Sequence, residues 1–493
     1  MRTEGPAPQT LAPAQRLIRS LNPLSLTFVG SLLLSLIAIL GVVTVGRDGA
    51  FYLDIARQVG EQGPAVAWKL FDWPWYSLLL AATHQVLRLP LEACAYLWSA
   101  LFLAGACTLM VDAVRQRVPQ AAYWACLVVL AMPAMNQFRG DIIRESGFWF
   151  FCTLALWLAM RWQAREGWGT AAAIYVAILL GCLFRLEAVL LLPAILTWRL
   201  PDLFDTNRRR RFVQLAWLPL AAVLTAVLAL LLVGDQQVRR WDYYMQLIQP
   251  SAMLGAFKQL SQQFADSLVN KYSADDAGRI VFIGLAGSLL IKCIALMGPT
   301  ALVFLSRRPW HAFAIYWREY RVAAIVAALY LNMLMLFFIR LQFVNGRYMS
   351  LLIVLLVPLL AVGLSLFASA HPRLGKALAA VGVLVMLANV ISLGAGKTQY
   401  IEAGRWIAQH THADAAVFYE DGRIAYYAGR PYQLSELTRE AAMAPDLAAR
   451  YQYFVIEAEG DEAWLHAWLH DHRQRVLAQF DNRKGDRMLV LGR

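Results

Sequence analysis

The chain of 493 residues is 59% hydrophobic and only 16% charged, which excludes an ordinary soluble multidomain protein and indicates a polytopic membrane protein. Its formal net charge is +12, but residues 397–493 contain 12 Lys and Arg against 14 Asp and Glu, whereas residues 1–396 contain 33 against 19. The basic excess therefore lies in the membrane part and its loops, which favours membrane orientation and phosphate binding over nucleic-acid binding.

The first predicted membrane span follows a basic N-terminus. Arg2, Arg16 and Arg19 precede an apolar stretch that runs from Leu24 to Val45. This stretch is too long for the apolar region of a signal peptide, and no clear small-x-small cleavage site follows it. We therefore expect an uncleaved first span, with the N-terminus in the cytoplasm.

Further apolar runs of spanning or near-spanning length continue along the chain, and together they predict a polytopic α-helical membrane protein of about 11 to 12 membrane helices. They lie at 93–114, 119–136, 143–161, 170–184, 186–199, 212–234, 279–305, 319–341, 347–369 and 376–396. The uncertain member of the series is 73–88, which is short and begins with Trp73-Pro74-Trp75-Tyr76.

Basic clusters predict the orientation, because cytoplasmic loops are enriched in Lys and Arg. The candidate inside loops are "VRQRVPQ" (114–120), "RWQAREG" (161–167), "NRRRRF" (207–212), "SRRPW" (306–310) and "HPRLGK" (371–376). All five share one side if 73–88 is a juxtamembrane or re-entrant helix, which we prefer. If 73–88 crosses, "VRQR" faces outside or another weak span must be dropped. On the preferred reading the chain ends outside, in the periplasm of a bacterial cell.

We expect two parts in this chain. Residues 1–396 form the transmembrane domain, with outside loops at 46–92 and 235–278. Residues 397–493 alternate short apolar runs such as "YQYFVIEA" with helix-like stretches such as "IEAGRWIAQH", which predicts a small periplasmic α/β domain.

Charged residues gather at the outside ends of the predicted spans, where ionisable groups are functional candidates by default. They are Asp48, Arg139, Asp141, Arg144, Glu145, Arg185, Glu187, Arg340 and Arg347. Guanidinium groups bind phosphate oxygens and stabilise charge on a departing phosphate, while a carboxylate can accept a proton from an incoming hydroxyl. The pattern predicts a transferase with a phosphate leaving group.

Four motifs resemble the C-type glycosyltransferase (GT-C) superfamily, in its branch of aminoarabinose transferases and protein mannosyltransferases. They are "GRDGAFYLDIARQV" (46–59), "WPWYSLLLA" (73–81), "LFRLEAVLLLPAIL" (183–196) and "NGRYMSLLIVLLVPLL" (345–360). The resemblance covers essentially the whole chain. Two departures stand out: Asp48-Gly49 replaces an acidic pair, and Trp73-Pro74-Trp75-Tyr76 replaces Pro-Pro-x-Tyr.

The resemblance implies transfer of a sugar from a polyprenyl-phosphate donor to a lipid, glycan or protein acceptor at the periplasmic face, usually with inversion. It implies Asp48 as the catalytic carboxylate and Arg347 as a ligand of the lipid phosphate. The remaining expected substrate-binding residues are Tyr348, Arg185, Glu187, Arg139, Asp141, Arg144, Tyr52 and Tyr76. No cofactor is required, and a divalent metal ion is possible without being indicated.

Structural alternatives stay open for these residues. Asp48 could cap the helix that follows it, Arg185 and Glu187 could form an internal pair, and Arg347 could anchor at the lipid head groups. In "RGDIIRES" the charges could neutralise one another. The histidines of "WLHAWLHDH" have i, i+4 spacing, which fits a solvated amphipathic helix better than a metal site.

Two other functions compete with the transferase. A transporter or flippase of lipid-linked sugars would use the same basic cavity without breaking a bond, but the charges gather at one end of the spans rather than at the bilayer midplane. A scaffold that recruits envelope enzymes predicts that replacing Asp48 or Arg347 is harmless.

Overall fold

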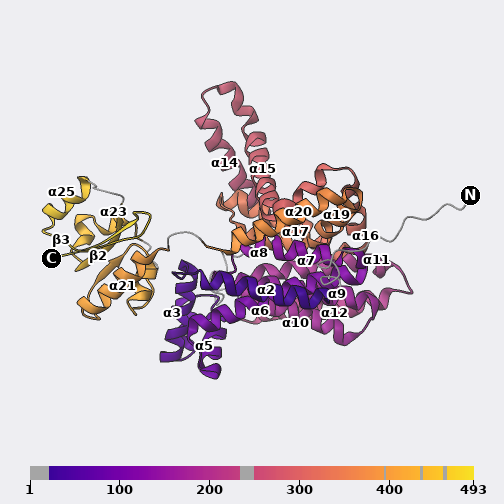
Figure 1. Cartoon of the computed structure of the whole chain (residues 1–493), viewed down its shortest axis with the longest axis horizontal. Helices are drawn as coiled ribbons and strands as arrows, with labels where there is room; N and C mark the ends of the chain where they lie inside the picture. Colours follow the sequence, from indigo (N-terminus) through magenta and orange to yellow (C-terminus); the bar gives the residue numbers. More distant parts are fainter. Residues whose placement is uncertain (1–20, 234–248, 393–395, 434–436, 459–462) are drawn as a thin grey trace, which may run out of the picture.

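The computed structural model describes residues 21–233, 249–392, 396–433, 437–458 and 463–493. A helical bundle forms most of the molecule, and a small domain that contains a β-sheet lies at one end of it (Figure 1). The basic residues Arg2, Arg16 and Arg19, and residues 235–248 of the expected outside loop, lie outside the described residues.

The bundle consists of helices whose bounds follow the predicted apolar runs closely. They are α2 (Pro23–Leu40), α6 (Leu91–Arg117), α7 (Ala122–Ala131), α8 (Pro133–Asn136), α9 (Glu145–Ala164), α10 (Trp168–Phe184), α11 (Leu191–Phe204), α12 (Arg209–Val233), α15 (Ala277–Met297), α16 (His311–Glu319), α17 (Arg321–Leu341), α18 (Gly346–Leu355), α19 (Val357–Ala370) and α20 (Pro372–Val390). Short 3₁₀ segments join several of them: η1 (Pro119–Ala121), η2 (Leu186–Leu190), η5 (Gly298–Leu305) and η6 (Arg308–Trp310).

Five helical segments of the described chain are long and apolar enough to cross a membrane, or six if the bent pair α18 and α19 counts as one span. The predicted total of 11 to 12 is therefore not confirmed. The difference arises because several runs fold as short or broken helices. Pro133 separates α7 from α8, a 3₁₀ turn separates α10 from α11, and α18 and α19 meet at 60° just before Pro358.

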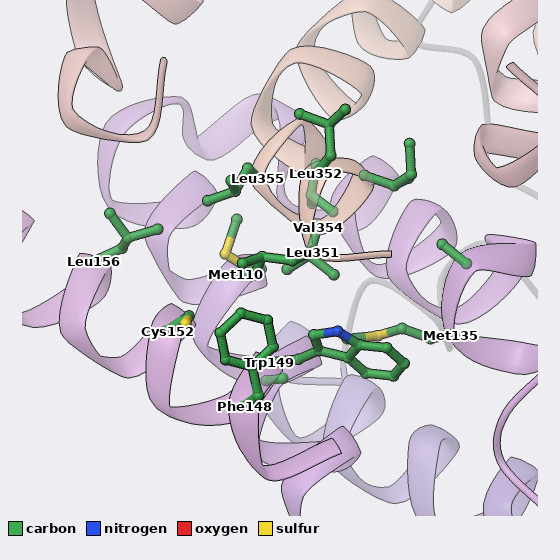
Figure 2. Packing of buried hydrophobic residues seen from close by; sticks show 14 of the residues in the cluster. Met110, Met135, Phe148, Trp149, Cys152, Leu156, Leu351, Leu352, Val354 and Leu355 are labelled. Atoms are coloured by element: carbon green, nitrogen blue, oxygen red, sulfur yellow. The ribbon is translucent and has the colours of Figure 1, made fainter. Parts of the chain in front are cut away.

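The centre of the bundle is packed around α9, which contacts α6, α10 and α18. Figure 2 shows Phe148 and Trp149 of α9 facing Met110 of α6, Met135 of α8 and the leucines of α18. Gly147 of α9 permits this close approach, because a Cβ there would lie 2.4 Å from the ring of Phe184. This contact therefore sets the distance between α9 and the C-terminal end of α10, where Phe184 lies.

Segment 73–88 folds as α5 (Trp75–Leu87), a helix of 13 residues. At 1.5 Å per residue it is about 20 Å long, shorter than a hydrocarbon core of about 30 Å. It packs beside α3 (Arg47–Gln62) and α4 (Ala65–Leu70) at the end of the bundle nearest the sheet domain (Figure 1). These lengths support the preferred juxtamembrane reading.

A helical hairpin projects from the bundle (Figure 1). It pairs α14 (Pro250–Ser267) with α15, joined through η4 (Lys271–Asp276). The described part of the predicted outside segment 235–278 is thus mainly helical.

The C-terminal part contains a four-stranded mixed sheet in the order β1-β2-β4-β3. The strands are β1 (Val417–Tyr419), β2 (Tyr453–Ala458), β3 (Arg475–Asp481) and β4 (Arg487–Gly492), of which β1 and β2 are parallel and the other pairs antiparallel. The helices are α21 (Thr398–His410), α22 (Gly422–Tyr427), α23 (Arg439–Ala442), α24 (Pro445–Ala448) and α25 (Ala463–Asp471). This part of the chain therefore has the α and β content that its sequence pattern predicted.

Candidate functional site

Asp48 and Arg347 form an ion pair between residues 299 positions apart in the sequence, through Oδ2 and Nη1. Asp48 lies in the first turn of α3, and Arg347 lies in the first turn of α18. Their side chains are 46% and 26% exposed, so a ligand can reach both groups. The helix N-cap is Gly46, and the Asp48 side chain makes no capping hydrogen bond. The N-cap alternative for Asp48 is therefore not what the fold uses.

Position 49, next to Asp48, is a glycine because the backbone of α3 lies close to the turn before α9. A Cβ at Gly49 would lie 2.7 Å from Val45 and 2.9 Å from Ile142, and Gly49 is buried. The position that differs from the acidic pair of the GT-C motif has no room for a carboxylate. In this chain the acidic motif after the first span therefore consists of Asp48 alone, with no second carboxylate beside it.

Arg347 is presented by a helix start that is fixed by local hydrogen bonds. Gln342 adopts a left-handed conformation with φ of 52° and ends α17, and the Asn345 side chain caps α18 by accepting from the backbone N–H of Tyr348 at 3.1 Å. Tyr330 donates its hydroxyl to the backbone oxygen of Tyr348 at 2.9 Å. The first turn of α18 therefore has a defined position.

Arg185 lies between two carboxylates. Its Nη1 is 2.7 Å from Oε1 of Glu145, and its other guanidinium nitrogens bond to Glu187. The guanidinium also lies 4.6 Å from the ring centroid of Tyr348. Because Arg185 is 8% exposed and is paired on both sides, it is less available to an anion than Arg347. The predicted pair of Arg185 and Glu187 exists, with Glu145 as an unforeseen third member.

Asp141 lies in the turn between α8 and α9, close to the same groups. Burial raises the pKa of its carboxyl, and the nearby charges of Asp48 and Glu145 raise it further, against the lowering effect of Arg347. Asp141 therefore belongs to the cluster of Asp48, Glu145 and Arg347 rather than pairing with Arg139.

Arg139 lies apart from this cluster. It is fully buried against α2, where its guanidinium donates to the Ser31 carbonyl and to the hydroxyls of Ser31 and Ser35, each at 2.9 Å. Its Nε donates to Asn136 at 2.7 Å. In this structure Arg139 joins α8 to α2 through four hydrogen bonds from Nε and Nη1, while its buried Nη2 has no hydrogen-bond partner among the described residues.

The remaining predicted residues, Arg144, Tyr52 and Tyr76, take part in the aromatic packing around α3 and α5. The Arg144 guanidinium lies 5.5 Å from the ring centroid of Phe71. Tyr52 and Tyr76 are buried and meet edge to face at 5.4 Å. Burial raises the pKa of Tyr52 to about 12, with Arg144, Glu145 and Asp48 as charged neighbours. Both tyrosines are therefore buried packing residues that are neutral at physiological pH.

Sequence reasoning left Glu145 out of the expected site and did not single out Lys292. Lys292 lies within the apolar helix α15, and its Nζ donates to the backbone oxygen of Val344, in the turn before Arg347. The signal for Lys292 was available, because a lone lysine in a long apolar helix marks a functional or pairing position. Glu145 was among the charged candidates at the outside ends of the spans, but its pairing with Arg185 could not be foreseen, since the two residues are 40 positions apart.

Two clefts lie at this end of the described structure. One has a volume of about 450 Å³ and is bounded by the end of α2, the turn that contains Asp141, the end of α20 and Lys397. The other, of about 470 Å³, lies between the end of α2, the start of α6 and the C-terminal domain. Asp48 and Arg347 line neither cleft, although Asp141 connects the first cleft to their cluster.

The described residues contain no group of three or more His, Cys, Asp or Glu side chains placed to hold a metal ion. His472, which follows α25, stacks on Trp468 of that helix with ring centroids 4.6 Å apart, and His470 is exposed.

The chain is similar in structure to a solved protein over nearly its whole length. The crystal structure of ArnT from Cupriavidus metallidurans in the apo state superposes with a TM-score of 0.60 and 16% sequence identity, over 97% of this chain and 98% of that chain. No protein-family model and no curated protein sequence matches this chain. The similarity confirms, at the level of the fold, the resemblance to GT-C proteins of the ArnT type that the four motifs indicated.

Proposed function

We propose that this chain is an integral-membrane glycosyltransferase that moves a sugar from a polyprenyl-phosphate donor to an acceptor at the outer face of a bacterial inner membrane. The observation that carries the proposal is the accessible pair of Asp48 and Arg347, which brings together a carboxylate and a guanidinium that are 299 positions apart in the sequence. The ArnT-like fold supports the same chemistry. The C-terminal domain lies at this end of the bundle (Figure 1) and would be periplasmic.

In the proposed reaction, Arg347 binds the donor phosphate and Asp48 accepts the proton of the acceptor hydroxyl. The acceptor oxygen forms a bond to the anomeric carbon, while the bond from that carbon to the phosphate oxygen breaks and its electron pair leaves with the phosphate. Attack from the side opposite the phosphate inverts the anomeric centre. Arg347 stabilises the charge that grows on the leaving group.

The donor phosphate has to compete with Asp48 for Arg347. The donor phosphate is a diester monoanion whose two non-bridging oxygens can accept two parallel hydrogen bonds from one guanidinium, so it can take the place of the half-exposed Asp48 carboxylate. Donor binding would therefore release Asp48 at the moment when a base is needed. Arg185 would serve as a positioning residue, because its two carboxylates neutralise it while its guanidinium holds the ring of Tyr348.

Reconstitution with a radiolabelled polyprenyl-phosphate sugar tests the proposal. Wild-type protein is expected to release free lipid phosphate and to transfer the label. Asp48→Asn is expected to lower the rate by about 10²–10⁴-fold, the usual contribution of a general base. Glu61→Gln is the matched control, because Glu61 is exposed on the same helix. Movement of intact donor across the bilayer without bond cleavage would instead establish the flippase.

A further inference from the structure

We propose that the cleft between the membrane domain and the C-terminal domain binds a membrane phospholipid whose head group carries both a phosphate and a primary amine, as in phosphatidylethanolamine. The cleft has a volume of about 470 Å³ and is formed by the segment after α2, the first turns of α6, and α21 and α22 of the C-terminal domain. This site is separate from the pair of Asp48 and Arg347, neither of which lines it.

Charges of opposite sign line this cleft from its two sides. Arg405 of α21 is exposed and forms no hydrogen bond or ion pair with any residue that the structure describes. Glu92 lies in the first turn of α6, and its Oε1 accepts a hydrogen bond from the Tyr426 hydroxyl at 2.8 Å. A guanidinium is a phosphate ligand, and a carboxylate is a partner for an ammonium group.

The presence of Glu92 decides between the candidate head groups. A purely anionic head group would be attracted by Arg405 but repelled by Glu92 in the same cleft. A head group with one phosphate and one ammonium satisfies both charges and leaves neither unpaired, which avoids the cost of desolvating a lone ion. A primary amine also donates hydrogen bonds to the carboxylate, which the quaternary ammonium of choline cannot do.

The apolar wall of the cleft continues into the bilayer-facing surface of the first span. Val42, Val43 and Val45 line the cleft. Leu33, Leu36 and Leu40 of α2 are 53–78% exposed, and their spacing places them on one face of the helix, which ends three residues before Val43. An acyl chain can therefore follow α2 from the cleft into the membrane, which favours a lipid over a soluble phosphoamine.

The bound head group would connect the two domains. Tyr427 of α22 already accepts a hydrogen bond from the backbone N–H of Val45 at 2.8 Å, and its own hydroxyl hydrogen remains available for a phosphate oxygen. The lipid would add contacts from Arg405 on one side and Glu92 on the other. It would thereby hold the C-terminal domain against the membrane surface.

Lipid retention by the full chain tests this inference. The detergent-purified protein would be given equal amounts of phosphatidylethanolamine, phosphatidylcholine and phosphatidylglycerol, and bound lipid counted by native mass spectrometry. Wild type is expected to retain phosphatidylethanolamine about tenfold over the other two, the effect of one charge-assisted hydrogen bond. A photoreactive phosphatidylethanolamine should label residues 39–45, 92–96 or 401–405.

Variants separate the two charges. Glu92→Gln should abolish the preference for the amine, while its amide oxygen can still accept from Tyr426. Arg405→Gln should lower retention of all three lipids, and Arg450→Gln, an exposed arginine elsewhere on the same domain, should change nothing. Equal retention of the three lipids, a preference for phosphatidylglycerol, or labelling elsewhere would overturn the proposal. Displacement by soluble glycerophosphoethanolamine would show that the ligand is not a lipid.

Discussion

At the scale of single residues, pairing separates the two candidate phosphate ligands. Arg347 has one partner that is half exposed, whereas Arg185 is buried between Glu145 and Glu187. An arginine with two carboxylates has little remaining affinity for an anion, while an arginine with one accessible partner can exchange it for phosphate. The residue that contacts the proposed donor should therefore be Arg347.

Substitution of Arg347 should weaken donor binding and also lower kcat, because Arg347 binds the donor phosphate and stabilises the charge on the leaving group. Arg347→Gln removes the charge and is expected to raise the KM for the lipid donor about 10–100-fold, the usual value of a charge-assisted hydrogen bond. Arg347→Lys keeps the charge but loses the two-pronged geometry, so its KM should lie in between. Steady-state kinetics at varied donor concentration measure both. Arg88→Gln, exposed near the end of α5, is the control and should match wild type.

Asp141 should make stability depend on pH. Burial raises the pKa of its carboxyl above the ordinary value of about 3.9, so the folded state favours the protonated form. The stabilisation of the folded state by this preference is complete below the ordinary pKa of the unfolded chain, and it is lost as the pH rises through the raised pKa of the folded state. Asp141→Asn should therefore gain thermal stability relative to wild type as the pH increases. Parallel melting-temperature profiles for the two proteins would contradict this expectation.

At the scale of elements, small residues fix how closely helices approach. Gly147 of α9 lies against the ring of Phe184, the last residue of α10, and Arg185 follows directly. The spacing of α9 and α10 thus decides where the guanidinium of Arg185 meets Glu145. Helix packing and site geometry are set by the same contact.

Two glycine substitutions should have different effects. Gly147→Ala places a methyl group 2.4–2.7 Å from ring atoms of Phe184, and such overpacking costs about 1–3 kcal/mol. Gly169→Ala, in the first turn of α10, meets nothing within 4 Å and should be neutral or slightly stabilising. Thermal unfolding in detergent compares them. If Gly147→Ala were as stable as Gly169→Ala, the close approach of α9 and Phe184 would be wrong.

At the scale of the whole molecule, the C-terminal domain holds the helix that carries Asp48. Arg47 pairs with Asp421 at 2.7 Å, and the buried carboxylate of Asp54 accepts from the backbone N–H of Tyr432 at 2.9 Å. The hydroxyl of Tyr427 accepts a hydrogen bond from the backbone N–H of Val45, which precedes α3. The two domains therefore fix α3 together, although they are far apart in the sequence.

Removal of the Asp54 carboxylate should loosen this interface. Asp54→Ala leaves the N–H of Tyr432 and the side chain of Gln58 without their acceptor, at a cost of about 1–3 kcal/mol. Hydrogen–deuterium exchange should become faster in both α3 and α22, and transfer activity should fall even though Asp54 does not contact Asp48. Glu61→Ala on the same helix should exchange like wild type. Faster exchange confined to α3 would show that Asp54 does not join the domains.

The sequence by itself determined most of the helices of the membrane part, because apolar runs of sufficient length have few other stable structures in a bilayer. It also placed Asp48 and Arg347 at the same end of the spans, since positive charges orient the chain. The predicted number of spans stays unconfirmed, because hydropathy does not register where proline and 3₁₀ turns break a helix.

Only the tertiary structure decided which charges meet. The neighbours Arg139 and Asp141 have different surroundings: Arg139 bonds to α2, whereas the charges of Arg347, Asp48 and Glu145 act on Asp141. Arg185 pairs with Glu145, forty residues away. Pairing of buried charges depends on which helix faces turn toward each other, and this follows from packing such as that of Gly147 against Phe184. Sequence spacing records the position of a charge along one helix but not the helix that packs against it.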